Sequence, residues 1–368
     1  MRIALLCMAL GVSSLLPLSG GTLDFYFMDV EAGNATLIVT PSGKAILIDG
    51  GSQRPAGRNA GRFFSLAKRL GIKELEYLLV THYHDDHYGA TPEISRGIRV
   101  VNWADHGPNA EHGKDAAWQK HWQIGVDERL YAEYLKAQGN SRHVVLRAGD
   151  RFAAGEVSVD VVNSAGEVIA TPLGGAGEPT PYCAATPLRS EDETEDGQSI
   201  GVVITFGRFR YASLGDLNWN RSRKLFCPEN LIGPVDVYLT THHGMSIDRG
   251  TSEIRWGRSC CPEAEVHGLR PRVAILNSGE RYHRLGTPRA WQVVRNSPEL
   301  EDFWQLHYVA DGGKDNNVHE RFIANLSAEN CQGHLIKLST SADGSFTVTN
   351  GRNGFTRSYA PGAKRRPE

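Results

Sequence analysis

The chain has 368 residues, of which 40% are hydrophobic and 22% are charged, and its formal net charge is −2. This composition is typical of a globular protein, and the length is sufficient to bury a sizeable core. A net charge near zero excludes a strong phosphate-neutralising field for nucleic acid. After the N-terminus, no segment has the roughly 20 apolar residues that a membrane span needs.

The N-terminal segment has the layout of a secretory signal peptide. Arg2 precedes an apolar stretch over residues 3–16, and Pro17 and small residues follow. We expect residues 1–21 to be removed by cleavage after Gly21. The remaining domain, residues 22–368, is then secreted or periplasmic and has no membrane anchor. The alternative is a buried first strand or helix.

Five cysteines remain after such a cleavage: Cys183, Cys227, Cys260, Cys261 and Cys331. An odd number in an oxidising compartment leaves at least one thiol free or paired between chains. No two are spaced as CxxC, which disfavours a cysteine zinc site. We expect the adjacent Cys260 and Cys261 to bond different partners rather than each other.

The first part of the domain reads as strands, a helix and a further strand. Branched and aromatic residues over residues 23–51 predict strands joined by the turn "PSGK". The segment "GRFFSLAKRLGI", residues 61–72, has helical periodicity and ends at Gly71. Residues 75–82, "LEYLLVTH", predict a buried strand. Polar residues follow that strand directly, and ligand sites of layered α/β folds gather at such strand ends.

The later elements follow the same pattern with two insertions. Residues 104–142 predict a loop and an inserted helical segment, and the Gly-, Pro- and acid-rich residues 164–197 predict a long surface loop. Strand patterns follow in three segments, and a C-terminal hairpin turns at "ADGS". The three segments are "QSIGVVITFGRFRYASLGDL", "VDVYLTTHHG" and "RPRVAILNSG".

A cluster of metal-binding residue types follows the strand over residues 75–82. His82, His84, Asp86 and His87 form an HxHxDH pattern. Residues two apart at a strand end point the same way, so His82 and His84 can share one metal ion. Asp86 and His87, beyond the bend, can face a second ion. Imidazole and carboxylate ligands suit Zn²⁺, Mn²⁺ or Fe. The alternative is a His-rich surface turn.

HxHxDH, together with "LIDGG" before it and "GD" and "HHG" after it, resembles the metallo-β-lactamase superfamily over roughly residues 23–350. Several segments look more narrowly like the hydrolase domain of ComEC/Rec2-type competence proteins and related secreted hydrolases. They include "SIGVVITFGRFRYASLGDL" and "VDVYLTTHHGMS". The resemblance implies a four-layer αββα sandwich of class α/β. It also implies a metal site along one edge, between the two sheets.

The resemblance also implies roles for individual residues. Asp49 in "LIDGG" would orient a ligand histidine, and Asp216 in "SLGDL" would bridge two metal ions. In "TTHHG" we expect His242 to be the last ligand of the second metal ion, while His243 stacks or binds substrate. Asp86 or Asp216 would orient the attacking hydroxide, and with Asp49 they form the predicted catalytic set.

One departure from the superfamily pattern concerns the first metal ion. The superfamily usually supplies a third histidine before the strand that leads to the bridging aspartate. Here that stretch is "SEDETEDGQSIGVVI", which has no histidine. Asp216, water, Asp196 or Gln198 could complete the site of His82 and His84. We therefore expect one or two Zn²⁺ ions, with Mn²⁺ as the alternative metal.

A metal ion in this site lowers the pKa of bound water and so supplies hydroxide for hydrolysis. The competence resemblance favours a small-molecule or polymeric phosphodiester as substrate. Arg281 and His283, near the third strand segment, could hold a phosphate. A lactone, carboxylic ester or β-lactam is the alternative substrate on the same scaffold. A non-catalytic metal-binding envelope protein is the alternative from a different functional class.

Overall fold

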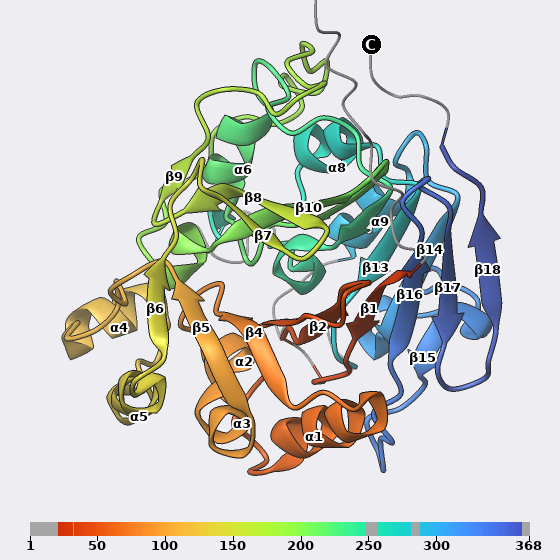
Figure 1. Cartoon of the computed structure of the whole chain (residues 1–368). Coiled ribbons are helices and arrows are strands. Elements are labelled where there is room, and N and C mark those ends of the chain that lie inside the picture. Colours follow the sequence, from red (N-terminus) through yellow and green to blue (C-terminus); the bar gives the residue numbers. More distant parts are fainter. Residues whose placement is uncertain (1–20, 32, 248–255, 281–287, 363–368) are drawn as a thin grey trace, which may run out of the picture.

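A computed structural model describes residues 21–31, 33–247, 256–280 and 288–362. Two mixed β-sheets pack face to face, and helices cover the outer face of each sheet (Figure 1). The αββα sandwich that the sequence predicted is therefore confirmed. The expected signal peptide lies outside the described residues except for Gly21. In the described part of the chain, no helix is both long and apolar enough to cross a membrane.

The first sheet has nine strands in the order β18-β17-β16-β1-β2-β3-β4-β5-β6. Strands β3 to β6 run parallel, and the remaining pairs are antiparallel. The strands are β1 (Leu23–Phe27), β2 (Thr36–Val39), β3 (Ala45–Ile48), β4 (Glu74–Leu79), β5 (Arg99–Asp105), β6 (Arg142–Val145), β16 (Ile336–Thr340), β17 (Phe346–Asn350) and β18 (Thr356–Tyr359). The predicted C-terminal hairpin is the pair β16 and β17.

The second sheet follows the order β15-β14-β13-β12-β11-β10-β8-β7, and β9 pairs with β8. Strands β11 to β15 run parallel, so their carboxyl ends lie at one edge. The strands are β7 (Arg151–Ala154), β8 (Val157–Ser164), β9 (Glu167–Val168), β10 (Gly201–Phe206), β11 (Phe209–Ser213), β12 (Val237–Leu239), β13 (Val273–Leu276), β14 (Asp302–His307) and β15 (Ile323–Asn325).

Helices lie on the two outer faces and in the connections between strands. The α-helices are α1 (Arg58–Leu70), α2 (Asp85–Tyr88), α3 (Thr91–Gly97), α4 (Ala116–Trp122), α5 (Glu128–Gln138), α6 (Trp219–Phe226), α8 (Glu263–Leu269) and α9 (Arg289–Arg295). Short 3₁₀ segments are η1 (Glu195–Gln198), η2 (Thr241–Gly244), η3 (Ala310–Gly312) and η4 (Glu320–Phe322). Helix α1 ends at Gly71, which has φ +70°. The predicted helix end is therefore confirmed.

Alternation along the strands divides the apolar residues among three cores. In β1, Phe25 and Phe27 face the core between the sheets, while Tyr26 faces the core under α1, α3 and α5. Phe25 reaches the other sheet, where its ring centroid lies 4.8 Å from that of Tyr211. A third core lies under α6, α8 and α9. These cores hold the strand ends in fixed positions at the edge where the polar residues gather.

Two expectations from the sequence are wrong. The end of the acidic loop is buried, and it carries Asp192, Glu195 and Asp196 into the protein. There Glu195 pairs with His106, and Asp196 pairs with Arg258. Cys260 and Cys261 form a disulfide with each other, and a second disulfide joins Cys183 to Cys227.

Candidate metal centre

The segments that carry the predicted ligands meet at one edge of the two sheets. β4 leads into the HxHxDH segment, β11 into Asp216, and β12 into the pair His242 and His243. Four groups of side chains have ligand atoms within 4.8 Å of one another. They are His82, His84 and Asp196; His82, His87 and Asp216; Asp86, His87 and His243; and Asp196, Asp216 and His242.

One half of the centre is built around His82 and His84. His82 Nε2 lies 3.1 Å from His84 Nδ1, and Asp196 Oδ1 lies 2.9 Å from that same His84 nitrogen. Asp216 Oδ2 lies 3.9 Å from His82 Nε2. The other His84 nitrogen, Nε2, lies 3.1 Å from Glu111 Oε1, so Glu111 holds the ring with Nδ1 facing the cluster.

The other half is built around His87 and His243. Their Nε2 atoms lie 2.9 Å apart. His87 Nε2 lies 3.2 Å from Asp216 Oδ1, and His243 Nε2 lies 3.2 Å from Asp216 Oδ2. Asp86 Oδ2 lies 3.6 Å from His243 Nε2. Asp216 thus contacts both halves, which is the position the resemblance implied for a bridging carboxylate.

Both histidines of the "HHG" segment lie in the cluster, although His242 was the one expected beside Asp86 and His87. His242 Nε2 lies 3.5 Å from Asp216 Oδ2 and 3.8 Å from Asp196 Oδ2, beside the half of His82 and His84. His243, and not His242, lies beside Asp86 and His87. The prediction relied on the alternation of side chains along a strand. That alternation does not extend to these histidines, because β12 ends at Leu239 and the chain then turns.

That turn has an uncommon backbone. His242 and His243 have φ values of 50° and 52°, and Gly244 follows at 73°. Three successive left-handed residues, two of them with a Cβ, cost conformational energy that the surroundings must compensate. The left-handed turn also explains how two adjacent imidazoles reach both halves of one centre.

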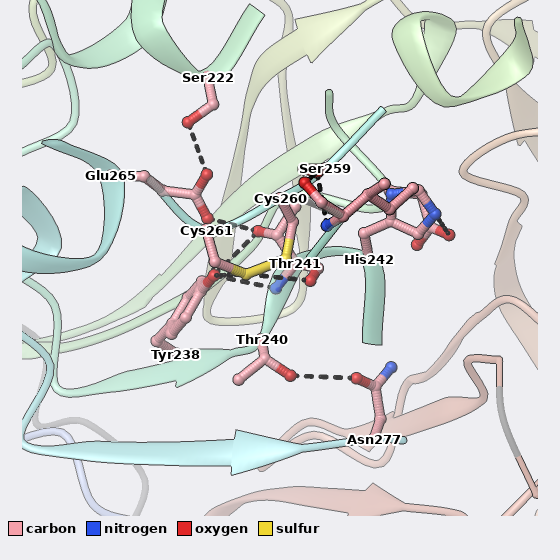
Figure 2. Close-up of a disulfide and its surroundings, with 12 residues drawn as sticks. Ser222, Tyr238, Thr240, Thr241, His242, Ser259, Cys260, Cys261, Glu265 and Asn277 are labelled. Atoms are coloured by element: carbon pink, nitrogen blue, oxygen red, sulfur yellow. Dashed lines mark hydrogen bonds and ion pairs between the residues drawn. A yellow bond between two sulfur atoms is a disulfide. The ribbon is translucent and has the colours of Figure 1, made fainter. Parts of the chain in front are cut away.

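A buried network supports the turn from behind (Figure 2). Glu265 Oε1 accepts hydrogen bonds of 2.6 Å from the hydroxyls of Tyr238 and Thr241. The Thr241 backbone N–H donates to the Tyr238 hydroxyl at 2.9 Å. The Cys260–Cys261 disulfide packs on the same segment, with Cys261 Sγ 3.3 Å from the Thr241 carbonyl oxygen. No pattern in the sequence pointed to Glu265 or to this disulfide as a support of the turn.

Asp196 comes from the stretch that lacks the superfamily's third histidine, and it lies beside His82 and His84. Its Oδ2 accepts a 2.6 Å hydrogen bond from Arg258 Nε, and both side chains are buried. Burial alone would raise the pKa of Asp196. The charges of Arg258, His242 and His84 outweigh burial and hold that pKa well below its usual range. Asp196 was one of the residues that could complete the site of His82 and His84, and the structure places it in the centre. The contact of Asp196 with Arg258 was not predicted from the sequence.

Asp49 lies behind His87 and away from the opening of the centre. Its Oδ2 is 2.8 Å from His87 Nδ1, which leaves His87 Nε2 facing the other ligands. Asp49 also accepts hydrogen bonds from the Thr81 backbone N–H, the Thr81 hydroxyl and the Asn34 amide. This is the orienting contact that the resemblance implied for Asp49.

The charge state of the centre suits a cation. Burial would raise the pKa of Asp216, but the imidazoles of His243, His87 and His242 hold it well below its usual range. Burial lowers the pKa of His82 and of His242, so both rings favour the neutral form that binds metals. Burial would lower the pKa of His84 and of His87, but the neighbouring carboxylates raise both pKa values well above their usual range, so these two rings release a proton when a metal ion binds. Carboxylates and imidazoles that face one another are the donor set of a transition-metal site.

Exposure shows which side of the centre is open. The side chains of Asp86 and His84 are 25% and 16% exposed, while His82, His87 and Asp216 are buried. Among the described residues, the centre is therefore open to solvent on the side of Asp86 and His84. The predicted phosphate-binding residues Arg281 and His283 lie outside the described residues, and the structure gives no position for them.

Comparison with known families agrees with this geometry. The family model described as "Metallo-beta-lactamase superfamily" matches residues 28–195, which include Asp49 and the HxHxDH segment. Residues 28–195 of this chain therefore belong to the metallo-β-lactamase superfamily. The chain's fold and its buried His/Asp cluster are those of a metal-dependent hydrolase. No curated protein matches the chain significantly.

Solved structures that are similar to this chain have low sequence identity to it. The metallo-β-lactamase fold protein YhfI from Bacillus subtilis is 9% identical, with a TM-score of 0.44 over 77% of this chain and 96% of that chain. A metal-dependent hydrolase of the β-lactamase superfamily is 15% identical, with a TM-score of 0.42 over 78% and 97%. CmlA, a diiron β-hydroxylase from Streptomyces venezuelae, is 15% identical, with a TM-score of 0.41 over 76% and 50%.

Proposed function

We propose that this protein hydrolyses phosphodiester or related phosphate ester bonds with two metal ions. The observation that carries the proposal is that two groups of ligand atoms share one carboxylate, Asp216. Paired metal sites of this kind suit in-line displacement at phosphorus, because attacking and leaving oxygens are both stabilised. A bound metal ion would supply hydroxide near neutral pH.

The protein's own residues prepare the site for this reaction. His82, His87 and Asp216 are buried and hold their ligand atoms away from bulk water. Asp86 lies on the open side, where the attacking water and the substrate arrive. Asp49 and Glu111 fix the rings of His87 and His84 from behind. Each ring therefore presents one chosen nitrogen to the centre.

The ligand set supports Mn²⁺ as well as Zn²⁺ as the cofactor. Asp196 replaces an imidazole in one half, and Asp86 and Asp216 supply carboxylates to the other. Carboxylate oxygens suit Mn²⁺ better than a set made only of histidines would. We propose that both halves fill, and that the half of His82 and His84 binds its ion more weakly.

We also propose that the mature chain begins at Thr22 and works outside the cytoplasm. The two disulfides support this proposal, because disulfides persist in oxidising compartments. N-terminal sequencing of exported protein should begin at Thr22. Recovery of the intact N-terminus from the cytoplasmic fraction would contradict the proposal.

A substrate panel tests the proposed reaction. Bis-p-nitrophenyl phosphate, a lactone and nitrocefin are compared with added Mn²⁺ and with added Zn²⁺. We expect metal-dependent turnover of the phosphodiester, loss of that turnover in Asp216→Asn, and normal turnover in Asp343→Asn. Asp343 is a matched control because it lies in the exposed turn between β16 and β17.

Two other outcomes would overturn the phosphodiester proposal. Preferred turnover of the lactone or of nitrocefin would assign the site to carbonyl substrates. Stoichiometric metal binding without turnover of any member of the panel would favour a non-catalytic metal-binding protein.

A further inference from the structure

A second group of metal-binding residue types lies outside the centre described above. Asp29 follows β1, His307 ends β14, and Cys331 lies in the connection between β15 and β16. Their ligand atoms lie within 4.8 Å of one another. The group joins the first sheet to the second at the strand edge that carries the main centre. Strands β2 and β3 in one sheet and β13 in the other separate the two places.

We propose that Asp29, His307 and Cys331 bind a second kind of metal ion, a thiolate-preferring divalent cation of the Zn²⁺ class. Cys331 Sγ lies 3.1 Å from Asp29 Oδ2 and 3.7 Å from His307 Nε2. Asp29 Oδ1 lies 2.9 Å from His307 Nε2. Tetrahedral Zn²⁺ bonds place S, N and O ligand atoms about 3.3–3.6 Å apart, so small adjustments would admit the ion.

The orientation of His307 argues against a nucleophilic triad in this group. A triad divides the two nitrogens of its histidine, one facing the thiol and the other facing the carboxylate. Here the thiol and the carboxylate both face Nε2, and Nδ1 has no hydrogen-bond partner in the described structure. Convergence on one nitrogen is the arrangement expected around a cation.

The surroundings hold the sulfur and the carboxylate in place. The Gly333 backbone N–H donates to Cys331 Sγ at 3.4 Å. Arg62 Nη1 lies 3.1 Å from Asp29 Oδ2, so Arg62 balances part of the negative charge while Oδ1 faces His307. The Asn325 amide donates to the backbone oxygens of Leu306 and His334, which ties the Cys331 loop to the end of β14.

The group is accessible to ions from solvent. A pocket of about 460 Å³ borders it and is lined by residues that include Asp29, Arg62, Gln332 and Gly333. Asp29 and His307 are 1% exposed, while Cys331 is partly exposed. Cys331 is also the free cysteine among the residues that the structure describes. The sequence disfavoured a cysteine zinc site because no CxxC is present, but a mixed site needs a single cysteine.

Cobalt substitution distinguishes this site from the main centre, because the described ligand groups of the main centre contain no cysteine. The experiment uses a Cys7→Ser variant as the parent protein, so that a thiolate signal can be assigned to Cys331. Co²⁺ should then produce a thiolate-to-metal charge-transfer band. The band should disappear in Cys331→Ala and persist in Asp216→Asn. Cys331→Ala should bind one metal equivalent less and keep its hydrolytic activity. Absence of the band from fully loaded protein would overturn the proposal.

Alkylation keeps the test decisive if Cys331→Ala fails to fold. Labelling of Cys331 by iodoacetamide in the otherwise unaltered protein should slow by an order of magnitude or more with Zn²⁺, because a coordinated thiolate is protected. EDTA should restore the faster rate. Equal labelling rates with Zn²⁺ and with EDTA would overturn the proposal.

Discussion

His243 Nε2 lies 2.9 Å from His87 Nε2, although the two residues are 156 positions apart in the chain. Asp216 contacts both nitrogens, at 3.2 Å in each case. Two buried imidazoles approach this closely where a shared proton or a cation lies between them. The carboxylate beside both, and Asp86 on the open side, favour a cation.

Asp49→Asn should weaken metal binding without unfolding the protein. The change replaces the carboxylate that accepts from His87 Nδ1, so the ring loses its fixed orientation. Loss of such an orienting partner typically costs about 10–100-fold in metal affinity. A competition titration with a chromogenic chelator measures this loss, and Asp343→Asn is the control. Unchanged affinity in Asp49→Asn would show that His87 does not depend on Asp49.

Gly244→Ala should damage the metal centre as well as the fold. Gly244 has φ +73°, and an added Cβ would lie 2.9 Å from Leu276 Cδ1, behind the turn that carries both histidines. Gly43→Ala is the matched control, because Gly43 has φ +79° and nothing within 4 Å of the added Cβ. The left-handed conformation should cost each variant about 1–2 kcal/mol in the free energy of unfolding.

The two glycine variants should differ in bound metal. Gly43→Ala should retain the full metal content, while Gly244→Ala should lose part of it, as measured by elemental analysis after gel filtration. Equal metal content in both variants would mean that the turn tolerates a shift without disturbing the ligands.

Glu265→Gln should change how stability depends on pH. Burial raises the pKa of Glu265 above its ordinary value of 4.5, even though hydrogen bonds from Ser222, Thr241 and Tyr238 oppose the shift. The folded state then holds a proton that the unfolded state releases. The stability of the parent protein should therefore be full below about pH 4.5 and fall as the pH rises through the raised pKa.

In Glu265→Gln this loss should be absent, since glutamine does not titrate. Thermal unfolding of both proteins across this pH range, at saturating metal, measures the difference. Parallel stability curves for the two proteins would contradict the raised pKa of Glu265.

Much of the fold could be predicted because strand alternation and the helix stop at Gly71 are local signals. The HxHxDH segment predicted the metal cluster for the same reason: its four residues follow β4 directly, so the end of that strand fixes where they lie. Asp49 and Asp216 came from the family resemblance, and each follows a buried strand. In all these cases the residue's place depends on a neighbouring element.

The remaining features depend on contacts between distant segments. Asp196 enters the centre because Arg258 compensates its buried charge, and 62 positions separate the two residues. The order of His242 and His243 depends on a left-handed turn that strand periodicity does not describe. The pairing of Cys260 with Cys261 is likewise a property of the folded loop.

Metal content measured together with turnover tests the central claim most directly. Protein purified without chelator is analysed for bound metal before and after dialysis against EDTA, alongside Asp216→Asn. We predict two Zn²⁺ or Mn²⁺ ions per chain at the main centre, counted in the Cys331→Ala variant so that the second site does not contribute. EDTA should abolish hydrolysis, added metal should restore it, and Asp216→Asn should stay inactive although folded. Full turnover by metal-free protein, or by Asp216→Asn, would contradict the account.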